Sequence, residues 1–146
     1  MDIKHEARQT RETSAGWYIQ RLAARLDTTM AQALDEIGLT LPQLPILMTA
    51  LEHDGLTQAD YANRFRKPPY AISRAIDGLV EAGLLERRPD KNSRRAHNIY
   101  VTQAGRTLAP KLFARIADVN AGMLSPLEPA EAQMLLSLLT KTLNAT

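Results

Sequence analysis

The stretch from Pro68 to Gly105 constrains the fold more than any other part of this 146-residue chain. It begins with apolar residues three and four positions apart, the spacing of one buried helix face: Ile72, Ala75, Ile76, Leu79 and Val80. Pro68 and Pro69 suit a first helical turn, because the amides there have no helical partner to lose. Gly83 can end the helix in a left-handed conformation. The pattern therefore predicts a helix over residues 68–82.

The period of the pattern changes directly after Gly83. Residues 84–88 predict a short strand, residues 89–93 a turn and residues 96–101 a returning strand. A helix followed at once by a hairpin with a basic tip is typical of a winged helix. The helix can fill a major groove, while the tip of the wing (residues 84–101) reaches a phosphate ridge or the neighbouring minor groove.

Five short patterns follow one another along this stretch: Ala71-Ile72-x-Arg74, Leu79-Val80, Gly83-Leu84-Leu85, Arg94-Arg95 and Thr102-x-x-Gly105. In order and spacing they resemble the MarR family of bacterial winged-helix transcription regulators. The chain departs from the family pattern at Ser93. Members of the family usually have Asp or Asn directly before the paired basic residues of the wing, where the side chain helps to orient a wing arginine.

The rest of the chain predicts helices around this winged helix. Residues 1–14 look like a polar arm or frayed helix start, and a long helix from Trp17 to Gly38 has an apolar seam: Ile19, Ala23, Leu26, Met30, Ala33 and Ile37. The next helix begins near Leu39 and ends before Gly55, with a second apolar face: Leu44, Leu47, Met48 and Leu51. Thr57 and Asp60 have the spacing of a capping box at the start of a short supporting helix.

Two further helices are predicted near the C-terminus. Thr102 is the expected N-cap of a long helix that contains Pro110, where a mild kink or a later start is expected. Its inward residues are expected to be Leu108, Leu112, Ile116, Val119 and Met123. Glu128 and Pro129 open the last helix, whose apolar residues are Met134, Leu135, Leu138, Leu139 and Leu143.

These elements predict a mostly α-helical fold with a small β-wing, in one compact domain. We assign residues 1–38 to an N-terminal arm and dimerisation helix, 39–104 to a winged helix-turn-helix, and 105–146 to C-terminal dimerisation helices. The outer helices would expose apolar stripes that a soluble monomer rarely tolerates. A second copy would bury them in a self-complementary interface, and the resemblance implies such a dimer. The alternative is that they fold back on their own winged helix.

The charge distribution supports a nucleic-acid partner. Ten of the 18 basic residues but only four of the 16 acidic residues lie between Arg64 and Arg106. This segment therefore has a net charge of +6, whereas the remainder has −4. A positive charge gathered on the groove-entering elements is the electrostatic pattern of a DNA binder.

We predict that nine residues contact DNA: Arg66, Lys67, Tyr70, Ser73, Arg74, Arg88, Lys91, Arg94 and Arg95. Arg74 is the foremost candidate for base reading, because its planar fork matches O6 and N7 of guanine. Alternatively, Arg74 lies along Asp77 or Glu81 of its own helix, and Tyr70 packs its ring against the core. Among the wing arginines, one is expected to line the minor groove and the other to pair with Asp90 or Glu86.

Other chemistries find little support in the sequence. Without cysteine the chain has no disulfide, thiolate zinc site or thiol redox sensor, which is compatible with a reducing cytoplasm. The polar N-terminus lacks the apolar run of a signal peptide, and no apolar segment is long enough to span a membrane, so we expect a soluble cytoplasmic protein. His5, His53 and His97 are too scattered for a metal site. No catalytic constellation is visible, so we expect no enzyme activity and no cofactor.

The MarR resemblance also implies a crevice for a small aromatic or phenolic acid. Residues that could line it combine aromatic walls with a cation: Trp17, Tyr18, Arg21, Met48 and His53. Simple core packing by Trp17 and Met48 is the alternative. The sequence thus predicts a homodimeric, ligand-responsive repressor that binds a pseudo-palindromic operator. The alternatives are a winged helix that serves only as a protein-interaction module, or a small enzyme.

Overall fold

The computed structural model describes residues 2–145 and divides into two compact units. The central unit is Met30–Arg115. The terminal unit joins the described residues up to Thr29 with those from Ile116 onward. The central unit extends beyond both ends of the predicted winged helix-turn-helix at residues 39–104.

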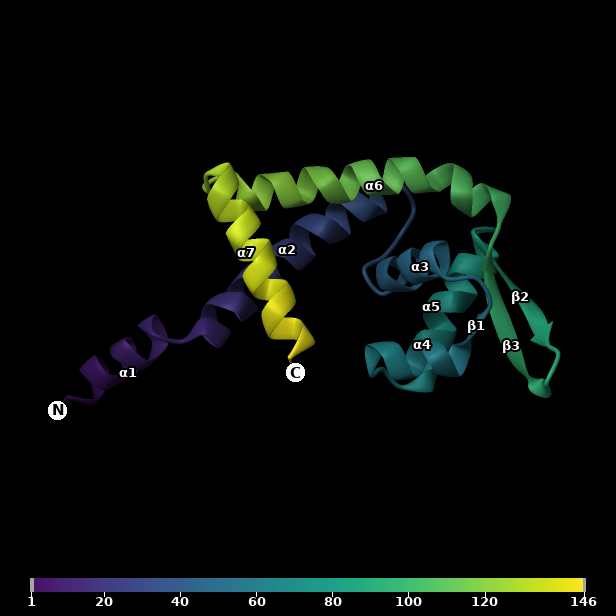
Figure 1. Ribbon diagram of the computed structural model, residues 1–146, viewed down its shortest axis with the longest axis horizontal. Helices are drawn as coiled ribbons and strands as arrows, with labels where there is room; N and C mark the ends of the chain where they lie inside the picture. The colour runs from purple at the N-terminus through teal and green to yellow at the C-terminus, as the bar shows by residue number, and fades with distance from the viewer. Residues whose placement is uncertain (1, 146) are drawn as a thin grey trace. The chain divides into compact units, whose positions relative to one another are not determined.

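Figure 1 shows the helices and strands of both units in chain order. The helices are α1 (Ile3–Glu12), α2 (Ala15–Asp35), α3 (Gln43–Glu52), α4 (Gln58–Phe65), α5 (Pro69–Glu81), α6 (Gln103–Leu124) and α7 (Pro129–Asn144). The strands are β1 (Leu56–Thr57), β2 (Leu85–Asp90) and β3 (Ser93–Val101). This is the predicted mostly helical fold with a small β-wing.

The core of the central unit is built around α5. Four of its five predicted core residues are buried, namely Ile72, Ala75, Ile76 and Leu79, while Val80 is half-buried. The helix packs on α3, α4 and β2, which lie around it in Figure 1. Gly83 follows with a φ of 78°, as the sequence predicted. Because β-carbon crowding makes this conformation costly for other residues, glycine ends the helix at little expense.

The helix α4 begins as its sequence predicted. Thr57 accepts a hydrogen bond from the backbone N–H of Asp60 at 3.2 Å, and the Asp60 carboxylate accepts one from the Thr57 N–H at 2.9 Å. The pair satisfies two backbone donors that the first helical turn leaves open. Tyr61 on this helix is fully buried. Helices α4 and α5 form the predicted helix-turn-helix.

The three strands form one antiparallel sheet in the order β1-β3-β2. Leu85 lies opposite Val101, Arg87 opposite Ile99 and Pro89 opposite His97. The hairpin is longer than predicted, because only Lys91 and Asn92 form its turn. The predicted turn residues Pro89, Asp90 and Ser93 belong to the strands, with a register shift between Pro89 and Asp90. A bulge of this kind accommodates extra residues while the pairing continues.

One predicted apolar face needs correction. In α3 the buried residues are Ile46, Leu47, Thr49 and Ala50, whereas Leu44, Met48 and Leu51 are only half-buried. Several faces of an apolar helix satisfy the helical period, and the neighbouring elements decide which one is buried. In α2 the buried residues are Met30 and Leu34, and the seam residue Ile19 is half exposed in the single chain, so packing of the whole seam on another helix stays a prediction.

The remaining helices bury little surface in the terminal unit, to which α6 contributes only its residues from Ile116 onward. Residues 3–12 form the separate helix α1, with Asp2 as its N-cap, so of the two predicted alternatives the helix and not the polar arm is found. The helix α6 runs through Pro110 from Gln103, so the helix starts before the proline. Of its predicted inward residues, Leu112 and Val119 are buried, while Leu108, Ile116 and Met123 are half-buried. The helix α7 has no buried residue among those described.

Candidate nucleic-acid interface

The turn between α4 and α5 carries two cations. Arg66 ends α4 with a φ of 51°, and no other described residue except glycine has a positive φ. The Lys67 N–H donates to the Ala62 carbonyl at 3.3 Å. The side chains of Arg66 and Lys67 are both exposed. A left-handed conformation is disfavoured for a residue with a β-carbon, so this tight turn is imposed by the packing of the two helices.

The solvent face of α5 carries the predicted base-reading residues. Tyr70 is 71% exposed, so its ring does not cap the core as the alternative proposed. Ser73 is half-buried and Arg74 is exposed. Within residues 2–145 Arg74 forms no ion pair. Of its two predicted partners, Asp77 is bound by another arginine, and Glu81 has no ion pair either. The Arg74 guanidinium is therefore available to an external partner.

The wing presents three cations at its tip. Lys91, Arg94 and Arg95 are all exposed. Ser93 stands where the resembled family usually has Asp or Asn. Its hydroxyl accepts a hydrogen bond from the Arg95 backbone N–H at 3.4 Å. The ion pair with Asp90 or Glu86 that was predicted for Arg94 or Arg95 is absent from the described residues. Neither Arg94 nor Arg95 has such a partner, so both side chains extend from the tip without an internal counter-charge.

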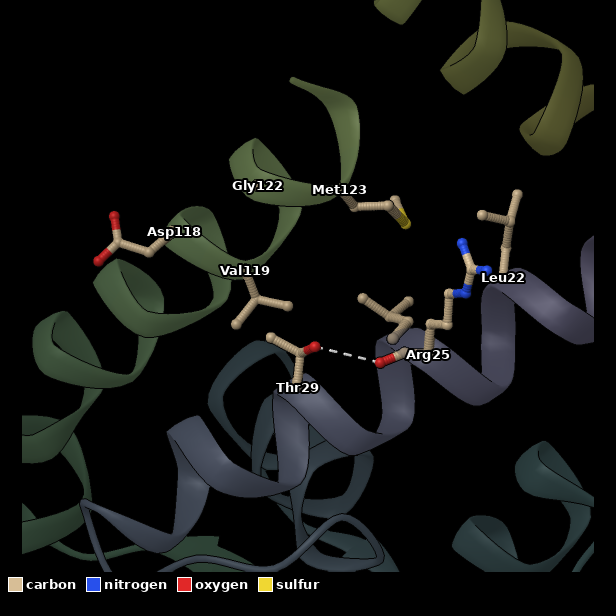
Figure 2. A pocket seen from close by; sticks show the side chains of 8 residues that line it. Leu22, Arg25, Thr29, Asp118, Val119, Gly122 and Met123 are labelled. Atoms are coloured by element: carbon tan, nitrogen blue, oxygen red, sulfur yellow. Dashed lines mark hydrogen bonds between the residues drawn. The ribbon is translucent and has the colours of Figure 1, made fainter. Parts of the chain in front are cut away.

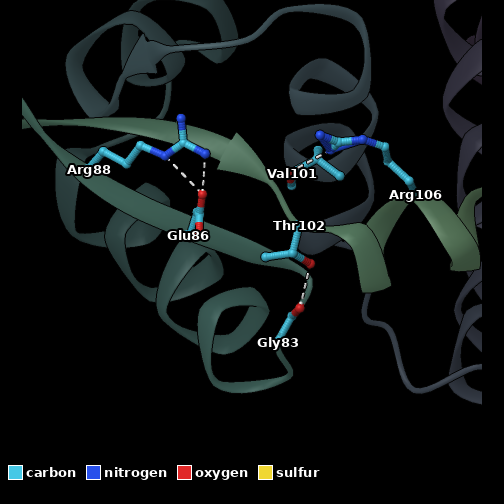
Figure 3. A network of polar contacts seen from close by, with 6 residues as sticks. All are labelled: Gly83, Glu86, Arg88, Val101, Thr102 and Arg106. Carbon is cyan, nitrogen blue, oxygen red and sulfur yellow. Dashed lines mark hydrogen bonds and ion pairs between the residues drawn. The ribbon is translucent and has the colours of Figure 1, made fainter.

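Arg88 has the partner that was predicted for a wing arginine. Its Nε donates to Glu86 Oε1 at 2.8 Å, and its Nη2 donates to the same oxygen, as Figure 3 shows. The guanidinium carbon lies 4.0 Å from the ring centroid of Tyr100, within the range of a cation–π interaction. The side chain is thus oriented along the hairpin. Its predicted contact with phosphate stays a prediction.

The base of the wing is fixed by the Thr102-x-x-Gly105 pattern. The Thr102 hydroxyl donates to the Gly83 carbonyl at 2.6 Å and accepts from the Gly105 N–H at 3.1 Å. A β-carbon at Gly105 would lie 2.5 Å from the Leu84 carbonyl oxygen, so only glycine fits there. Figure 3 also shows Arg106, whose Nη1 donates to the Val101 carbonyl at 2.8 Å. This cation therefore serves the fold.

Arg87 was not singled out in the sequence. Its Nε donates to Gln58 Oε1 at 2.8 Å, and its Nη2 donates to Asp77 Oδ1. The alternation of a strand offers a signal for this role, because Arg87 lies two residues after the buried Leu85 and must face the same side. The sequence could thus indicate that Arg87 faces the helices, although it could not name the partners.

Burial changes one titratable group of the central unit. Burial raises the pKa of Tyr61 to about 12, because desolvation disfavours the phenolate. Its hydroxyl has no hydrogen-bond partner among the described residues. This tyrosine is part of the packing under α5 and has no role in contacting DNA.

The five predicted ligand-binding residues are divided between the two units. Trp17, Tyr18 and Arg21 belong to the terminal unit, where all three are exposed. Met48 is half-buried in α3, and His53 ends that helix, with its Nε2 3.7 Å from a Glu52 carboxylate oxygen. The crevice that these residues were expected to form stays a prediction.

A separate hollow lies between α2 and α6 within the terminal unit (Figure 2). It has a volume of about 340 Å³ and is lined by Leu22, Arg25, Leu26, Thr29, Asp118, Val119, Gly122 and Met123. Val119 and Met123 point from α6 toward α2. The Thr29 hydroxyl donates a hydrogen bond to the Arg25 carbonyl at 3.1 Å. None of the five predicted ligand residues lines this mainly apolar hollow.

Within the described part of the chain, no three His, Asp or Glu side chains gather closely enough to hold a metal ion. None of the helices in residues 2–145 combines the length and apolar character needed to cross a membrane.

The comparisons with known proteins decide the family. Residues 37–96 match the model of the MarR family. Over 112 residues the chain is 30% identical to the HTH-type transcriptional repressor Rv2887 of Mycobacterium tuberculosis, covering 77% of this chain and 81% of the relative. The chain belongs to the MarR family. As a MarR-family protein it is a transcriptional regulator.

Solved structures show the same fold. A MarR transcriptional regulator from Methanosarcina mazei Go1 is 21% identical, with a TM-score of 0.84 over 89% of this chain and 94% of that one. A mutant MarR from E. coli, complexed with operator DNA, is 22% identical, with a TM-score of 0.78 over 98% of this MarR-family chain and 99% of that one. The winged helix predicted from the sequence is therefore confirmed.

Proposed function

We propose that this MarR-family chain is a homodimeric repressor that binds a pseudo-palindromic operator in double-stranded DNA. The observation that carries the proposal is the set of exposed cations without internal partners on α5 and the wing, of which Arg74 is the foremost. Relatives named as HTH-type transcriptional repressors support the assignment, as does a similarly folded MarR protein that was solved with operator DNA.

The helix α5 would read bases from the major groove. Two copies related by a two-fold axis would place their α5 helices about one helical turn apart, roughly 10 base pairs. Arg74 would donate two hydrogen bonds to a guanine, a contact that contributes roughly 1–3 kcal/mol of discrimination. Tyr70 and Ser73 would add contacts to thymine methyl groups, polar base edges or phosphate.

The remaining cations would bind the DNA backbone. Arg66 and Lys67 project from the turn before α5, and Arg88 lies along the hairpin. These residues neutralise phosphates, which raises affinity for any sequence. Lys91 and the two wing arginines extend from the tip, where a guanidinium can enter the negative potential of the minor groove.

Selection of bound duplexes from a random pool tests the operator proposal directly. We expect enrichment of an inverted repeat whose half-sites are about 10 base pairs apart. Affinity for the selected duplex should fall about a thousandfold or more between 50 and 200 mM salt, as expected for 6–10 phosphate contacts. Failure to bind any duplex at low salt, or a strictly monomeric protein, would overturn the proposal. Such a result would favour a protein-interaction module.

A small aromatic or phenolic acid is the effector class that we propose for the repressor. Trp17 and Tyr18 are 43% and 45% exposed, and Arg21 on the same helix forms no ion pair among the described residues. Rings and a cation of this kind suit an aromatic carboxylate. Thermal unfolding and DNA release with a panel of such acids test the idea, with Arg21→Ala as the variant expected to lose the response. No effect of any acid on either measurement would exclude this class.

A further inference from the structure

Arg87 connects three elements of the central unit. It lies on β2 and donates from Nε to Gln58, the first residue of α4, at 2.8 Å. From Nη2 it donates to Asp77 in the third turn of α5. We call these three residues the Arg87 bridge. No other side-chain hydrogen bond among the described residues joins the wing to α5.

The bridge is partly removed from solvent. The side chain of Arg87 is 25% exposed, less than half the 57% of its neighbour Arg88. Because the Arg87 side chain is mostly shielded from solvent and two of its nitrogens are bound within the chain, it is poorly placed to bind a phosphate. A guanidinium presents several donors in a rigid plane, so two acceptors bound to it are fixed in relative position.

Asp77 is an unusual residue for a surface that approaches DNA. It lies on α5, three residues after Arg74, and its side chain is 62% exposed. An unpaired carboxylate there would repel phosphates and weaken binding. The ion pair with Arg87 offsets this charge, and it also ties the reading helix to the strand that leads into the wing.

We propose that Arg87 is a positioning residue for sequence recognition, with Asp77 and Gln58 as its partners. The bridge fixes the angle of α5 relative to α4 and the wing, so that Arg74 meets a base edge while the wing cations meet the same duplex. The inference rests on the proposed function, because it concerns how that function distinguishes sequences. Displacement of a reading side chain by a fraction of an ångström weakens a bidentate contact, whereas contacts with phosphate tolerate it better.

Two acidic residues of α5 provide a matched pair of variants. Asp77→Ala and Glu81→Ala each remove one negative charge from the same helix, and alanine favours the helix in both cases. Glu81 has no partner among the described residues, whereas Asp77 holds Arg87. If charge alone mattered, both variants would bind every duplex more tightly. The Arg87 bridge instead predicts that Asp77→Ala lowers the specificity and that Glu81→Ala leaves it unchanged.

The measurement is the ratio of affinities for two duplexes. The first is the duplex that the wild-type chain selects from a random pool, and the second is a scrambled duplex of the same composition. We expect Asp77→Ala and Arg87→Ala to lower this ratio about tenfold, the equivalent of one impaired base contact. Glu81→Ala should keep the ratio of the wild type and bind both duplexes slightly more tightly.

The salt dependence separates positioning from direct contact with phosphate. Arg87→Ala should keep the slope of log affinity against log salt, because no phosphate partner is lost. By contrast, Lys67→Ala should reduce that slope by about 0.9. In a double-mutant cycle, Arg87→Ala and Asp77→Ala should be strongly non-additive in the affinity ratio, because either variant breaks the same bridge.

Three results would overturn the inference. These are an unchanged affinity ratio in Asp77→Ala, a reduced salt slope in Arg87→Ala, or additive effects in the cycle. If either alanine variant fails to fold, Asp77→Asn and Arg87→Lys replace the pair. These variants must also lower the affinity ratio, although by a smaller factor. A wild-type chain that binds no duplex would instead overturn the proposed function itself, so the two failures can be told apart.

Discussion

The two units of the molecule differ in how they bury apolar surface. Among the described residues, 17 of the 18 buried apolar side chains lie in the central unit, and only Val119 lies in the terminal unit. Exposed large apolar side chains show the reverse distribution. Eleven of 13 belong to the terminal unit, and the other two are Tyr70 and Phe113. The central unit therefore has a core of its own, whereas the terminal unit lacks one.

This difference indicates how each unit is stabilised. Burial of apolar surface is the main favourable contribution to folding, so the central unit can be stable within one chain. Rows of exposed apolar side chains such as those on α2 and α7 are unusual in a soluble monomer. In the proposed dimer a second copy would supply the missing surface, and the terminal unit would acquire its core from the interface. In that arrangement specificity for DNA resides in one unit and the assembly in the other.

The largest predicted effect concerns α7. Leu138 and Leu139 are 52% and 44% exposed in the single chain. We expect the double variant Leu138→Glu/Leu139→Glu to weaken the dimer by roughly 3–6 kcal/mol, because the interface loses the burial of two leucines and must also desolvate two carboxylates. That corresponds to a dissociation constant raised roughly 100- to 10,000-fold. Sedimentation equilibrium measures it, and Gln133→Glu, on the polar face of α7, is the control. A dimer that survives the double variant would contradict the assigned interface.

A cavity in the central unit should have the next largest effect. Leu79 is fully buried between α5 and its neighbours. We expect Leu79→Ala to lower the free energy of unfolding by roughly 2–5 kcal/mol, because the lost side chain leaves a cavity. Glu81→Ala on the same helix should change it by less than about 0.5 kcal/mol. Urea unfolding measures both values. A small effect of Leu79→Ala would mean that the central unit also depends on a second copy for its core.

The contrast between the units also explains what the sequence could predict. The helix α5, the glycine after it and the Thr57–Asp60 capping box follow from local chemistry, and the structure confirms them. The buried face of α3 was mispredicted, because the neighbours of a helix decide which apolar face is covered. The helix α1 has almost no apolar period, so the sequence left a polar arm or a frayed helix start open, although its Lys, Glu, Ala, Arg and Gln residues favour a helix.

The site shows the same division between local and non-local information. The exposure of Arg74, Arg94 and Arg95 was predictable, because their positions on a helix face and a hairpin tip determine it. The partners of Arg87 were not. Arg87 meets Asp77 ten residues earlier and Gln58 29 residues earlier, and only the folded chain brings these side chains together.

Tyr61 gives the central unit a sensitivity to high pH. In the folded state its pKa is raised to about 12, from a value of 10.0 in the absence of burial. The unfolded chain therefore loses its phenol proton first as the pH rises. Stability is fully present below pH 10 and should fall by roughly 2–3 kcal/mol as the pH approaches 12.

The variant Tyr61→Phe should remove this loss. Because the hydroxyl has no partner among the described residues, its removal should be neutral or stabilising by about 1 kcal/mol at pH 7. Urea unfolding at pH 7 and across pH 9.5–12 measures both effects. Tyr18→Phe removes an exposed hydroxyl from the terminal unit and is the matched control. Parallel pH profiles for the wild type and Tyr61→Phe would show that Tyr61 is not the group responsible.

The smallest predicted effect concerns sequence reading by the central unit. Arg74→Ala should reduce discrimination between the selected duplex and a scrambled one by roughly 1–3 kcal/mol, because a bidentate contact to guanine is lost. Lys111→Ala removes an equal charge from the exposed side of α6, outside the proposed interface, and should leave discrimination unchanged. Fluorescence anisotropy titrations with both duplexes measure the ratio.

Arg74→Ala also tests whether DNA reading and dimer assembly are separate properties of the two units. If reading resides in α5 and assembly in the terminal helices, Arg74→Ala should leave the dimer dissociation constant of the wild type unchanged. The α7 double variant should weaken binding to the selected duplex and to the scrambled one, because both duplexes meet the paired reading helices of a dimer. An Arg74→Ala protein with unchanged discrimination would exclude base reading by this arginine and leave it only a phosphate contact. Loss of dimerisation in Arg74→Ala would instead show that the units are coupled, because an exposed arginine in the central unit would then affect the interface of the terminal unit.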